Sequence, residues 1–317
     1  MLKFLFESNN QQVTKVFIKP LGTSETIRFL TKVINRIMNK KNYVLKKNDH
    51  IIWDEWFAGV VDGDGYFYIN KNKQISFELT TSVFDLNILY TIKNKLGAGS
   101  IKPRSGSNSF RYRVKARLII ENIVDRLNGR LHNPGRRSQF EKVCAILNIS
   151  IKKSSSILET PNGYLAGLID SDGTISISIS KTNAVTSQKP GKEGNIARLS
   201  QSKGFNQMYV KITSVYKEPL LIITKSYKFG TIYIEKKNFK NRKPKDQYHW
   251  IIRSYEDFSL LYENLKQYPL KSSKMHRIRL SLKYFNYKQL KFHLKDPNTI
   301  EYKIWLKFCN SWFKYNF

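Results

Sequence analysis

Cysteine is nearly absent from the 317-residue sequence: only Cys144 and Cys309 occur, each in an apolar stretch typical of a helix. Two thiols can build neither a disulfide framework nor a zinc site. The five histidines stand singly, which argues against a histidine-centred nuclease. Long hydrophobic runs are also missing, because no apolar run approaches the ~20 residues of a membrane span. Residues 1–6 are too short for the core of a signal peptide.

Acidic side chains are few as well. The sequence has 24 Asp and Glu against 55 Lys and Arg, a formal net charge of +31. Such an excess destabilises the compact state by self-repulsion unless a polyanion binds. Nucleic acid is the favoured polyanion, and an anionic membrane surface is the weaker alternative. Because no basic amphipathic helix is evident beyond residues 24–47, we expect no membrane partner.

The remaining composition describes a folded chain. Hydrophobic residues make up 41% of it, enough to bury a sizeable core, and the length suggests about two domains. Abundant Lys, Asn, Ile, Tyr and Phe reflect A/T-rich codons, as in many organelle genomes. Residues 24–40 predict an amphipathic helix followed by a basic tail. This segment is interpreted as an extension packed on the main domain, or as a direct nucleic-acid contact.

An internal repeat dominates the rest of the sequence. The nonapeptide Phe57–Gly65 matches Leu165–Gly173 at an offset of 108 residues, with five of nine positions identical. Each copy is predicted to end a helix and to be followed by strand pairs. Strands are expected over 66–70, 75–81, 100–102 and 110–116, and again over 174–180, 208–214, 230–235 and 248–253. Helices are expected over 85–96 and 118–127, and over 219–227, 255–265 and 274–283.

This order predicts an α+β fold of two pseudo-symmetric αββαββα repeats. Each repeat would form a four-stranded antiparallel saddle sheet, and the two would join at a two-helix interface. The predicted units are an N-terminal extension (1–50), a first half (51–150), a linker (151–163) and a second half (164–317). Thr160 and Pro161 are expected to start the second motif helix, and 181–203 to form a long hairpin loop.

Small residues form one stripe of each motif helix, which lets two helix backbones approach closely. The stripe predicts two helices packed across a pseudo-twofold axis within a monomer. The predicted interface residues are Ala58, Gly59 and Asp62 on the first helix and Ala166, Gly167 and Asp170 on the second.

Asp64 and Asp172 occupy the predicted C-terminal ends of the two helices. The helix dipole disfavours a carboxylate there by roughly 0.3–1 kcal/mol, and two such carboxylates also repel each other. A cation between them would relieve both effects. The all-oxygen donor set suits Mg²⁺, with Mn²⁺ as a substitute, and a metal beside a polyanion surface indicates phosphodiester hydrolysis.

Two other interpretations of the motif are weaker. A calcium loop would need Asp or Asn at its fifth position, where Tyr66 and Thr174 stand. A plain helix-to-strand turn explains one Asp-x-Asp-Gly well, but two matched copies in so basic a chain disfavour it.

The two nonapeptides resemble the signature of the LAGLIDADG homing endonucleases, in the single-chain form with two motifs. The second copy departs from that signature at Ser171 only. The segments Leu96–Ile101 and Tyr268–Arg277 also resemble parts of such proteins, so the likeness covers about residues 51–290. Many members are encoded in organellar introns and fused to an upstream exon. The resemblance therefore implies a mitochondrial location, with the chloroplast less favoured, and accounts for the extension.

The resemblance also implies roles for single residues. Asp64 and Asp172 would be the catalytic, metal-binding acids, one for each DNA strand, and the backbone carbonyls of Gly63 and Ser171 would assist as metal ligands. Asp62 and Asp170 would be structural residues of the helix interface.

Lys271 would be the basic residue near the scissile phosphate, and Arg130 its counterpart in the first half. Because arginine does not lose its proton at working pH, Arg130 as a general base and Arg130 as a simple phosphate contact both stay open.

Strand alternation predicts the DNA contacts. In Arg111–Lys115 the basic residues fall on one face of the strand, over an apolar inner face. Solvated surface lysine is the alternative for each single position. The predicted DNA-binding residues are Lys71, Lys73, Arg111, Arg113, Lys115, Gln201, Lys203, Lys211, Lys236, Lys237 and Arg253. Two sheets in the major groove would cover about 20 base pairs.

The resulting hypothesis is a site-specific DNA endonuclease that makes a metal-dependent double-strand break for intron homing. The alternative is a maturase that binds its own intron RNA and assists splicing. A non-catalytic DNA-binding regulator is a third interpretation. Since the chain keeps both motif acids, cleavage is favoured over the other two.

Overall fold

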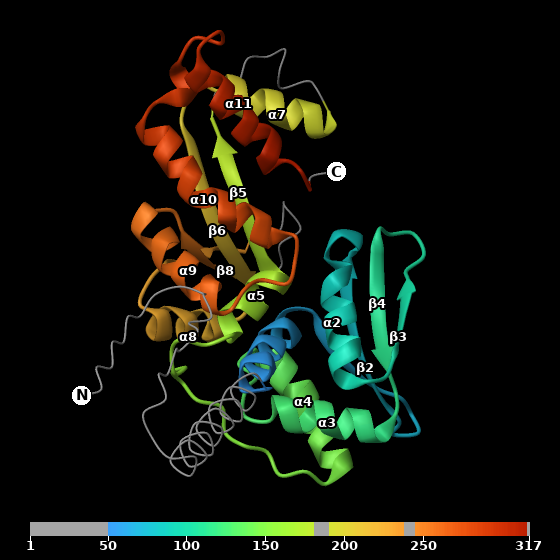
Figure 1. Ribbon diagram of the computed structural model, residues 1–317. Coiled ribbons are helices and arrows are strands. Elements are labelled where there is room, and N and C mark those ends of the chain that lie inside the picture. The colour runs from blue at the N-terminus through green and yellow to red at the C-terminus, as the bar shows by residue number, and fades with distance from the viewer. Residues whose placement is uncertain (1–49, 181–189, 238–244, 316–317) are drawn as a thin grey trace, which may run out of the picture. The chain divides into compact units, whose positions relative to one another are not determined.

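The computed structural model describes residues 50–180, 190–237 and 245–315. The helix expected over 24–40 and the extension 1–50, apart from its last residue, lie outside the described residues. The described chain contains two copies of one arrangement, in which a motif helix leads into a four-stranded antiparallel sheet (Figure 1).

The first copy begins with a helix over residues 50–64, called here the first motif helix. Its sheet consists of β1 (Gly65–Ile69), β2 (Ile75–Ser82), β3 (Ser100–Pro103) and β4 (Ser109–Val114). The short helix η1 (Val83–Asp85) and the helices α2 (Leu86–Leu96), α3 (Arg117–Leu127) and α4 (Pro134–Leu147) complete it.

The second copy begins with the second motif helix, α5 (Tyr164–Asp172). Its strands are β5 (Gly173–Ile179), β6 (Asn206–Ser214), β7 (Thr231–Glu235) and β8 (Gln247–Ile252). Its further helices are α7 (Gly191–Gln201), α8 (Glu218–Tyr227), α9 (Tyr255–Gln267), α10 (Lys274–Gln289), η2 (Phe292–Leu294) and α11 (Ile300–Trp312).

The two sheets have the same strand order and the same register. The order is β1-β2-β4-β3 in one sheet and β5-β6-β8-β7 in the other. The motif glycine Gly65 pairs with Leu79, and its counterpart Gly173 pairs with Ile212. The predicted α+β fold of two pseudo-symmetric halves with four-stranded antiparallel sheets is therefore confirmed.

One face of each sheet is covered by helices and forms the core. Figure 1 shows α2 in front of the first sheet and α9 and α10 in front of the second. The core residue opposite Leu79 is Tyr112, and the one opposite Ile212 is Trp250; both rings are fully buried. The other face of the first sheet carries polar side chains, among them Arg111 and Arg113, so it is available to a ligand, whereas the corresponding face of β8 carries the buried Ile251 and His249.

A matched pair of glycines fits these two aromatic rings. Gly99 and Gly230 both have positive φ angles, 102° and 77°. A Cβ at either position would press into the ring of Tyr112 or Trp250. Glycine is needed there both for the left-handed backbone and for the close contact.

Three details differ from the sequence-based expectation. Residues 181–203 were expected to form only a loop, but their described part contains α7. The second motif helix begins at Tyr164, with Gly163 at its N-cap, so Thr160 and Pro161 precede it. The sequence indicates a helical stretch around Cys144 without bounds; the structure shows α4 there, with Asn133 as its cap and Pro134 as its first residue, a combination common at helix starts.

The structure also describes both cysteines and the lengths of the helices. Cys144 and Cys309 are both free and buried, in α4 and α11 respectively. Among the described residues, no helix is both long and apolar enough to span a membrane.

Candidate active site

The two motif helices touch through their small residues. A Cβ on Gly167 would collide with the carbonyl oxygen of Trp56, and a Cβ on Gly59 would collide with that of Tyr164. Ala58 and Ala166 are also buried at these helices. The backbones therefore pack directly on one another, which brings the two C-terminal ends together.

Two reciprocal hydrogen bonds cross this interface. Trp56 donates its indole N–H to Asp170 Oδ2 at 2.8 Å, and Tyr164, the equivalent residue of the repeat, donates its hydroxyl to Asp62 Oδ2 at 2.7 Å. Burial raises the pKa of Asp62 to about 6, although the hydrogen bonds it accepts oppose the rise. Burial likewise raises the pKa of Asp170.

The same two carboxylates hold a loop of their own half. Asp62 Oδ2 accepts the backbone N–H groups of His132 and Asn133, at 2.7 and 3.1 Å. Asp170 accepts those of Lys271 and Ser272, at 2.9 and 3.0 Å. Each aspartate thus links the partner helix to the loop that leads into α4 or α10.

Tyr164→Phe is expected to destabilise the protein by about 1–3 kcal/mol, because the buried Asp62 loses a hydrogen-bond donor that no water replaces. Thermal or denaturant unfolding measures the loss. Tyr66→Phe is the matched control, since the Tyr66 side chain is exposed on β1. Equal stability of the two variants would contradict the role given to Tyr164.

Asp64 and Asp172 end their helices and lie at the contact between them. A Cβ built on Gly63 of the first helix would be 3.1 Å from Asp172 Oδ2 of the second. Burial, and next the charge of Asp172, raise the pKa of Asp64 to about 6. Burial also raises the pKa of Asp172. The two carboxylates therefore share a partly desolvated site in which each disfavours the charge of the other.

A groove opens next to this pair. Its volume is about 460 Å³, and its lining includes Asp64, Asp85, Ser171 and the cationic Arg104. Asp85 also accepts hydrogen bonds from the backbone N–H and hydroxyl of Ser273, both at 2.9 Å, and so ties the second half to the first.

Two cations hold the C-terminal carbonyls of the motif helices. Arg136, in the first turn of α4, donates to the Gly63 carbonyl at 2.9 Å. Lys274, the first residue of α10, donates its ammonium to the carbonyls of Ile169, Asp170 and Ser171 at 2.8–3.1 Å. Burial raises the pKa values of Asp64 and Asp172, and both cations oppose that rise. They neutralise helix ends that also carry carboxylates.

The structure places Lys271 and Arg130 elsewhere. The Lys271 ammonium lies 4.7 Å from the ring centre of Trp56, near the middle of the first motif helix. Arg130 donates to the Arg126 carbonyl at 3.0 Å and lines a pocket with Glu55 and Tyr164. Neither is brought to the acid pair, whereas Arg136 and Lys274 are.

The donor set at the helix ends is made of oxygen. The four groups expected from the sequence, the carboxylates of Asp64 and Asp172 and the carbonyls of Gly63 and Ser171, all lie there, and the two carbonyls accept hydrogen bonds from Arg136 and Lys274. No cluster of three or more His, Cys, Asp or Glu suited to a metal occurs among residues 50–180, 190–237 and 245–315. Oxygen-only ligation by few carboxylates fits Mg²⁺, which keeps several waters.

The polar face of the first sheet is strongly basic. A hollow of about 590 Å³ there is lined by Lys102, Arg104, Arg111, Arg113 and Lys115, together with small polar residues. Arg104 also lines the groove of the acid pair. A cationic surface therefore runs from the acid pair across β3 and β4.

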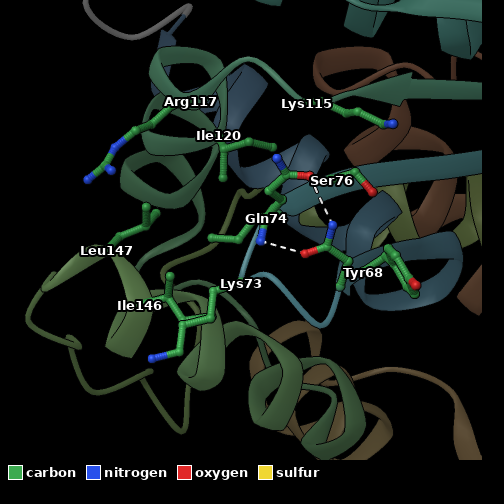
Figure 2. Close-up of a pocket in the computed structure, with 11 residues that line it drawn as sticks. Tyr68, Lys73, Gln74, Ser76, Lys115, Arg117, Ile120, Ile146 and Leu147 are labelled. Atoms are coloured by element: carbon green, nitrogen blue, oxygen red, sulfur yellow. Dashed lines mark hydrogen bonds between the residues drawn. The ribbon is translucent and has the colours of Figure 1, made fainter.

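A second hollow continues this surface at the β1–β2 turn. Figure 2 shows Lys73, Lys115 and Arg117 around a pocket of about 360 Å³, with Tyr68 at one side. Lys115 lines both hollows. Four of the predicted DNA contacts, Lys73, Arg111, Arg113 and Lys115, are thus brought together, and Lys71 lies in the same turn.

The predicted contacts of the second half are more dispersed. Lys211 lies on β6, whereas Gln201 ends α7 and Lys203 follows it. Lys236 and Lys237 follow β7, and Arg253 follows β8. Asp246 pairs with the Lys236 ammonium at 3.3 Å and accepts the Lys237 backbone N–H at 2.8 Å. The second sheet therefore presents fewer cations on its strands.

Comparison with known proteins agrees with this geometry. The family model described as LAGLIDADG endonuclease matches residues 57–153 and 165–294, more than half of the chain. The chain belongs to the LAGLIDADG endonuclease family. Both matched segments include a motif helix end with its aspartate.

Two curated relatives are similar over most of this chain. The intron-encoded RNA maturase bI4 of Saccharomyces cerevisiae is 30% identical over 98% of the chain, and this region is 48% of that protein. The probable intron-encoded endonuclease aI2 of Debaryomyces hansenii is 32% identical over 85% of the chain and 39% of its own length. The chain thus spans half or less of these relatives.

Solved LAGLIDADG structures show the same fold. The homing endonuclease I-LtrWI bound to target DNA matches 83% of this chain and 97% of its own, with a TM-score of 0.57 and 17% identity. The meganuclease I-SmaMI bound to uncleaveable DNA matches 81% and 97%, with a TM-score of 0.56 and 18% identity.

Sequence reasoning missed Arg136 and Lys274. Lys274 stands in the segment that carries the LAGLIDADG resemblance, three residues after Lys271, and only the backbone path of the loop distinguishes the two. Arg136 would have been found from the Asn133–Pro134 start of α4, which places a first-turn arginine beside the loop held by Asp62.

Proposed function

We propose that this protein is a site-specific DNA endonuclease that makes a double-strand break at a long target, as required for intron homing. The observation that carries the proposal is the pair Asp64 and Asp172 at two touching helix ends, beside a cationic sheet surface. The function is tested with a duplex that joins the exon sequences at the gene's own insertion site. Metal-dependent cutting at one position is expected.

The proposed cofactor is Mg²⁺, with Mn²⁺ as a substitute. Asp64 and Asp172 would hold it together with the carbonyls of Gly63 and Ser171. When bound, a divalent cation activates water and stabilises negative charge on the phosphate. Burial and the neighbouring charge of Asp172 both disfavour the charged form of Asp64, and a divalent cation between the two carboxylates would offset both effects.

Arg136 and Lys274 are proposed to stabilise the charge that develops on the scissile phosphates, one in each half. Their positions at the two helix ends support this, since both positive charges act on the carboxylates of the acid pair. Lys271 and Arg130 are proposed to act farther away, as supports of the interface and its linker or as contacts to flanking phosphates.

The proposed substrate is double-stranded DNA of about 20 base pairs, read by the polar faces of both sheets in the major groove. The hollows lined by Arg111, Arg113, Lys115 and Lys73 support this binding face. We propose that a single chain cuts both strands, since the two halves supply two acids. The intron-encoded relatives from yeasts support a mitochondrial location.

Lys274→Met is expected to lower the single-turnover cleavage rate by about 10²-fold, because a positioned charge at the transition state is lost. The dissociation constant for the duplex is expected to stay within about threefold. Lys271→Met serves as the comparison, and its effect on the rate is expected to be smaller. A larger loss for Lys271→Met would assign the phosphate-proximal role to Lys271 instead.

A second function is favoured by one specific observation. The bI4 RNA maturase matches 98% of this chain, which corresponds to 48% of bI4 itself, so assistance in splicing of the chain's own intron RNA is the alternative proposal. Tight binding of that RNA and faster splicing by the wild type support it. The Asp64→Asn, Asp172→Asn double variant separates the two functions, because splicing without DNA cutting requires neither acid.

A further inference from the structure

One acidic side chain lies within the basic surface of the first sheet. Glu78 is on β2, directly opposite Arg113 of β4, with Arg111 two residues along that strand. Only 10% of the Glu78 side chain is exposed, compared with 34% and 43% for Arg111 and Arg113. The two arginines therefore cover the carboxylate.

The contacts use defined edges of the guanidinium groups. Glu78 Oε1 accepts from Nε of Arg113 at 2.6 Å and also contacts its Nη2. Glu78 Oε2 lies 3.1 Å from Nη1 of Arg111. Glu78 thus holds the Arg113 guanidinium along the edge formed by Nε and Nη2. The edge that includes Nη1 faces away from this contact and can bind a ligand. A single carboxylate fixes two neighbouring forks and offsets part of their charge.

Both effects favour base reading over general phosphate attraction. Attraction to the DNA backbone depends on net positive charge and needs no fixed geometry. Guanine recognition needs two donors at fixed spacing, directed at O6 and N7. The Glu78 carboxylate lowers the net charge, which weakens attraction to the DNA backbone. It also fixes the arginine donors, which improves guanine recognition.

The second sheet lacks this device at the equivalent positions. In the shared register, Lys211 takes the place of Glu78, and Ile251 and His249 take those of Arg113 and Arg111. The His249 ring is buried, stacks on Tyr233 and contacts Thr213 and Glu235, at 2.9 and 3.1 Å. The two sheets therefore present different chemistry to the two halves of a target.

We infer that Glu78 is a positioning residue for specificity, which makes Arg111 and Arg113 readers of guanine in the half-site bound by the first sheet. The half-site bound by the second sheet has no matching guanine requirement at the equivalent steps. This inference rests on the proposed DNA-binding function and goes beyond it, because it names the base, the half-site and the residue that orients the readers.

The test compares the wild type with Glu78→Gln on a library of randomised duplexes. The wild type is expected to select guanine at one or two positions of one half-site. Glu78→Gln is expected to lose that selection, and its ratio of specific to non-specific affinity is expected to fall about tenfold. Its non-specific affinity should hold or rise, with a salt dependence steeper by about one phosphate contact.

Two further variants separate orientation from charge and from folding. Glu263→Gln removes the same charge at an exposed position on α9 and should leave the selection unchanged. Arg113→Lys keeps the charge but removes the fork, so it should lose the same guanine while non-specific binding is kept. This variant also keeps the test open if Glu78→Gln proves unstable in thermal unfolding.

The possible results separate the role inferred for Glu78 from the proposed endonuclease function. A specific wild type whose base selection is unchanged in both Glu78→Gln and Arg113→Lys would overturn the inference alone. A wild type with no preference among duplexes would overturn the inference together with the proposed endonuclease function.

Discussion

Asp64→Asn and Asp172→Asn are each expected to reduce double-strand cleavage by at least about 10²-fold while target binding is kept. Asparagine keeps the size of the side chain but removes the charge that holds a divalent cation. Both carboxylates are proposed ligands of one cation site. Loss of either charge therefore leaves an incomplete ligand set. Binding should not weaken, since the substitution removes negative charge next to phosphate.

The measurement is a single-turnover cleavage assay paired with a binding assay in Ca²⁺. Asp246→Asn is a matched control, because that aspartate directly precedes β8 and, among the described residues, pairs with Lys236 and Lys237 rather than with the acid pair. Cleavage at the wild-type rate by either acid variant would show that the reaction does not depend on the pair.

Gly167→Ala is expected to destabilise the protein by about 3 kcal/mol or more, which is a large part of the stability of an ordinary domain. The added methyl would meet the backbone carbonyl of Trp56, with Val60 N only 2.9 Å away. Backbone atoms of a packed helix cannot move aside as a flexible side chain can. The two halves would have to separate, which would also displace both acids.

Denaturant unfolding of Gly167→Ala measures this effect. Gly106→Ala is the control: its φ of 72° makes alanine unfavourable by roughly 1 kcal/mol, but nothing lies within 4 Å of the added Cβ. A Gly167→Ala protein as stable as the Gly106→Ala protein would contradict the direct helix contact.

The fold and the acid pair could be predicted from the sequence because both are encoded locally. Alternating apolar residues specify strands, and the repeated nonapeptide specifies a helix end followed by a strand. The small residues Gly59 and Gly167 predict close packing because only glycine permits it. Once the two helices pack, their last residues, Asp64 and Asp172, must be neighbours.

The residues around the pair could not be predicted in the same way. Lys271 and Lys274 are both lysines in the same short segment, so the sequence does not show which of them reaches the acid pair. That depends on the path of the loop, which Asp170 fixes by accepting the backbone N–H groups of Lys271 and Ser272. These two hydrogen bonds join residues about 100 positions apart in the sequence, and a local sequence pattern cannot predict such a contact. For the same reason Arg136 was missed, although the start of α4 is visible in the sequence.

The sequence also did not predict the difference between the polar faces of the two sheets. Strand alternation correctly placed Arg111 and Arg113 on one face, but it gave no cross-strand register. Only the pairing of β2 with β4 brings Glu78 between them. Register depends on the whole sheet, so it follows from tertiary packing rather than from the strand itself.

The most direct test of the central claim is cleavage of the fused-exon duplex from the gene's own locus, with Mg²⁺ and with Ca²⁺ as control. The wild type and the Asp64→Asn, Asp172→Asn double variant are assayed side by side. A discrete Mg²⁺-dependent double-strand break by the wild type, absent in the variant, is the predicted result. No cutting by the wild type despite tight binding of that duplex or of the intron RNA would contradict the endonuclease and favour the maturase.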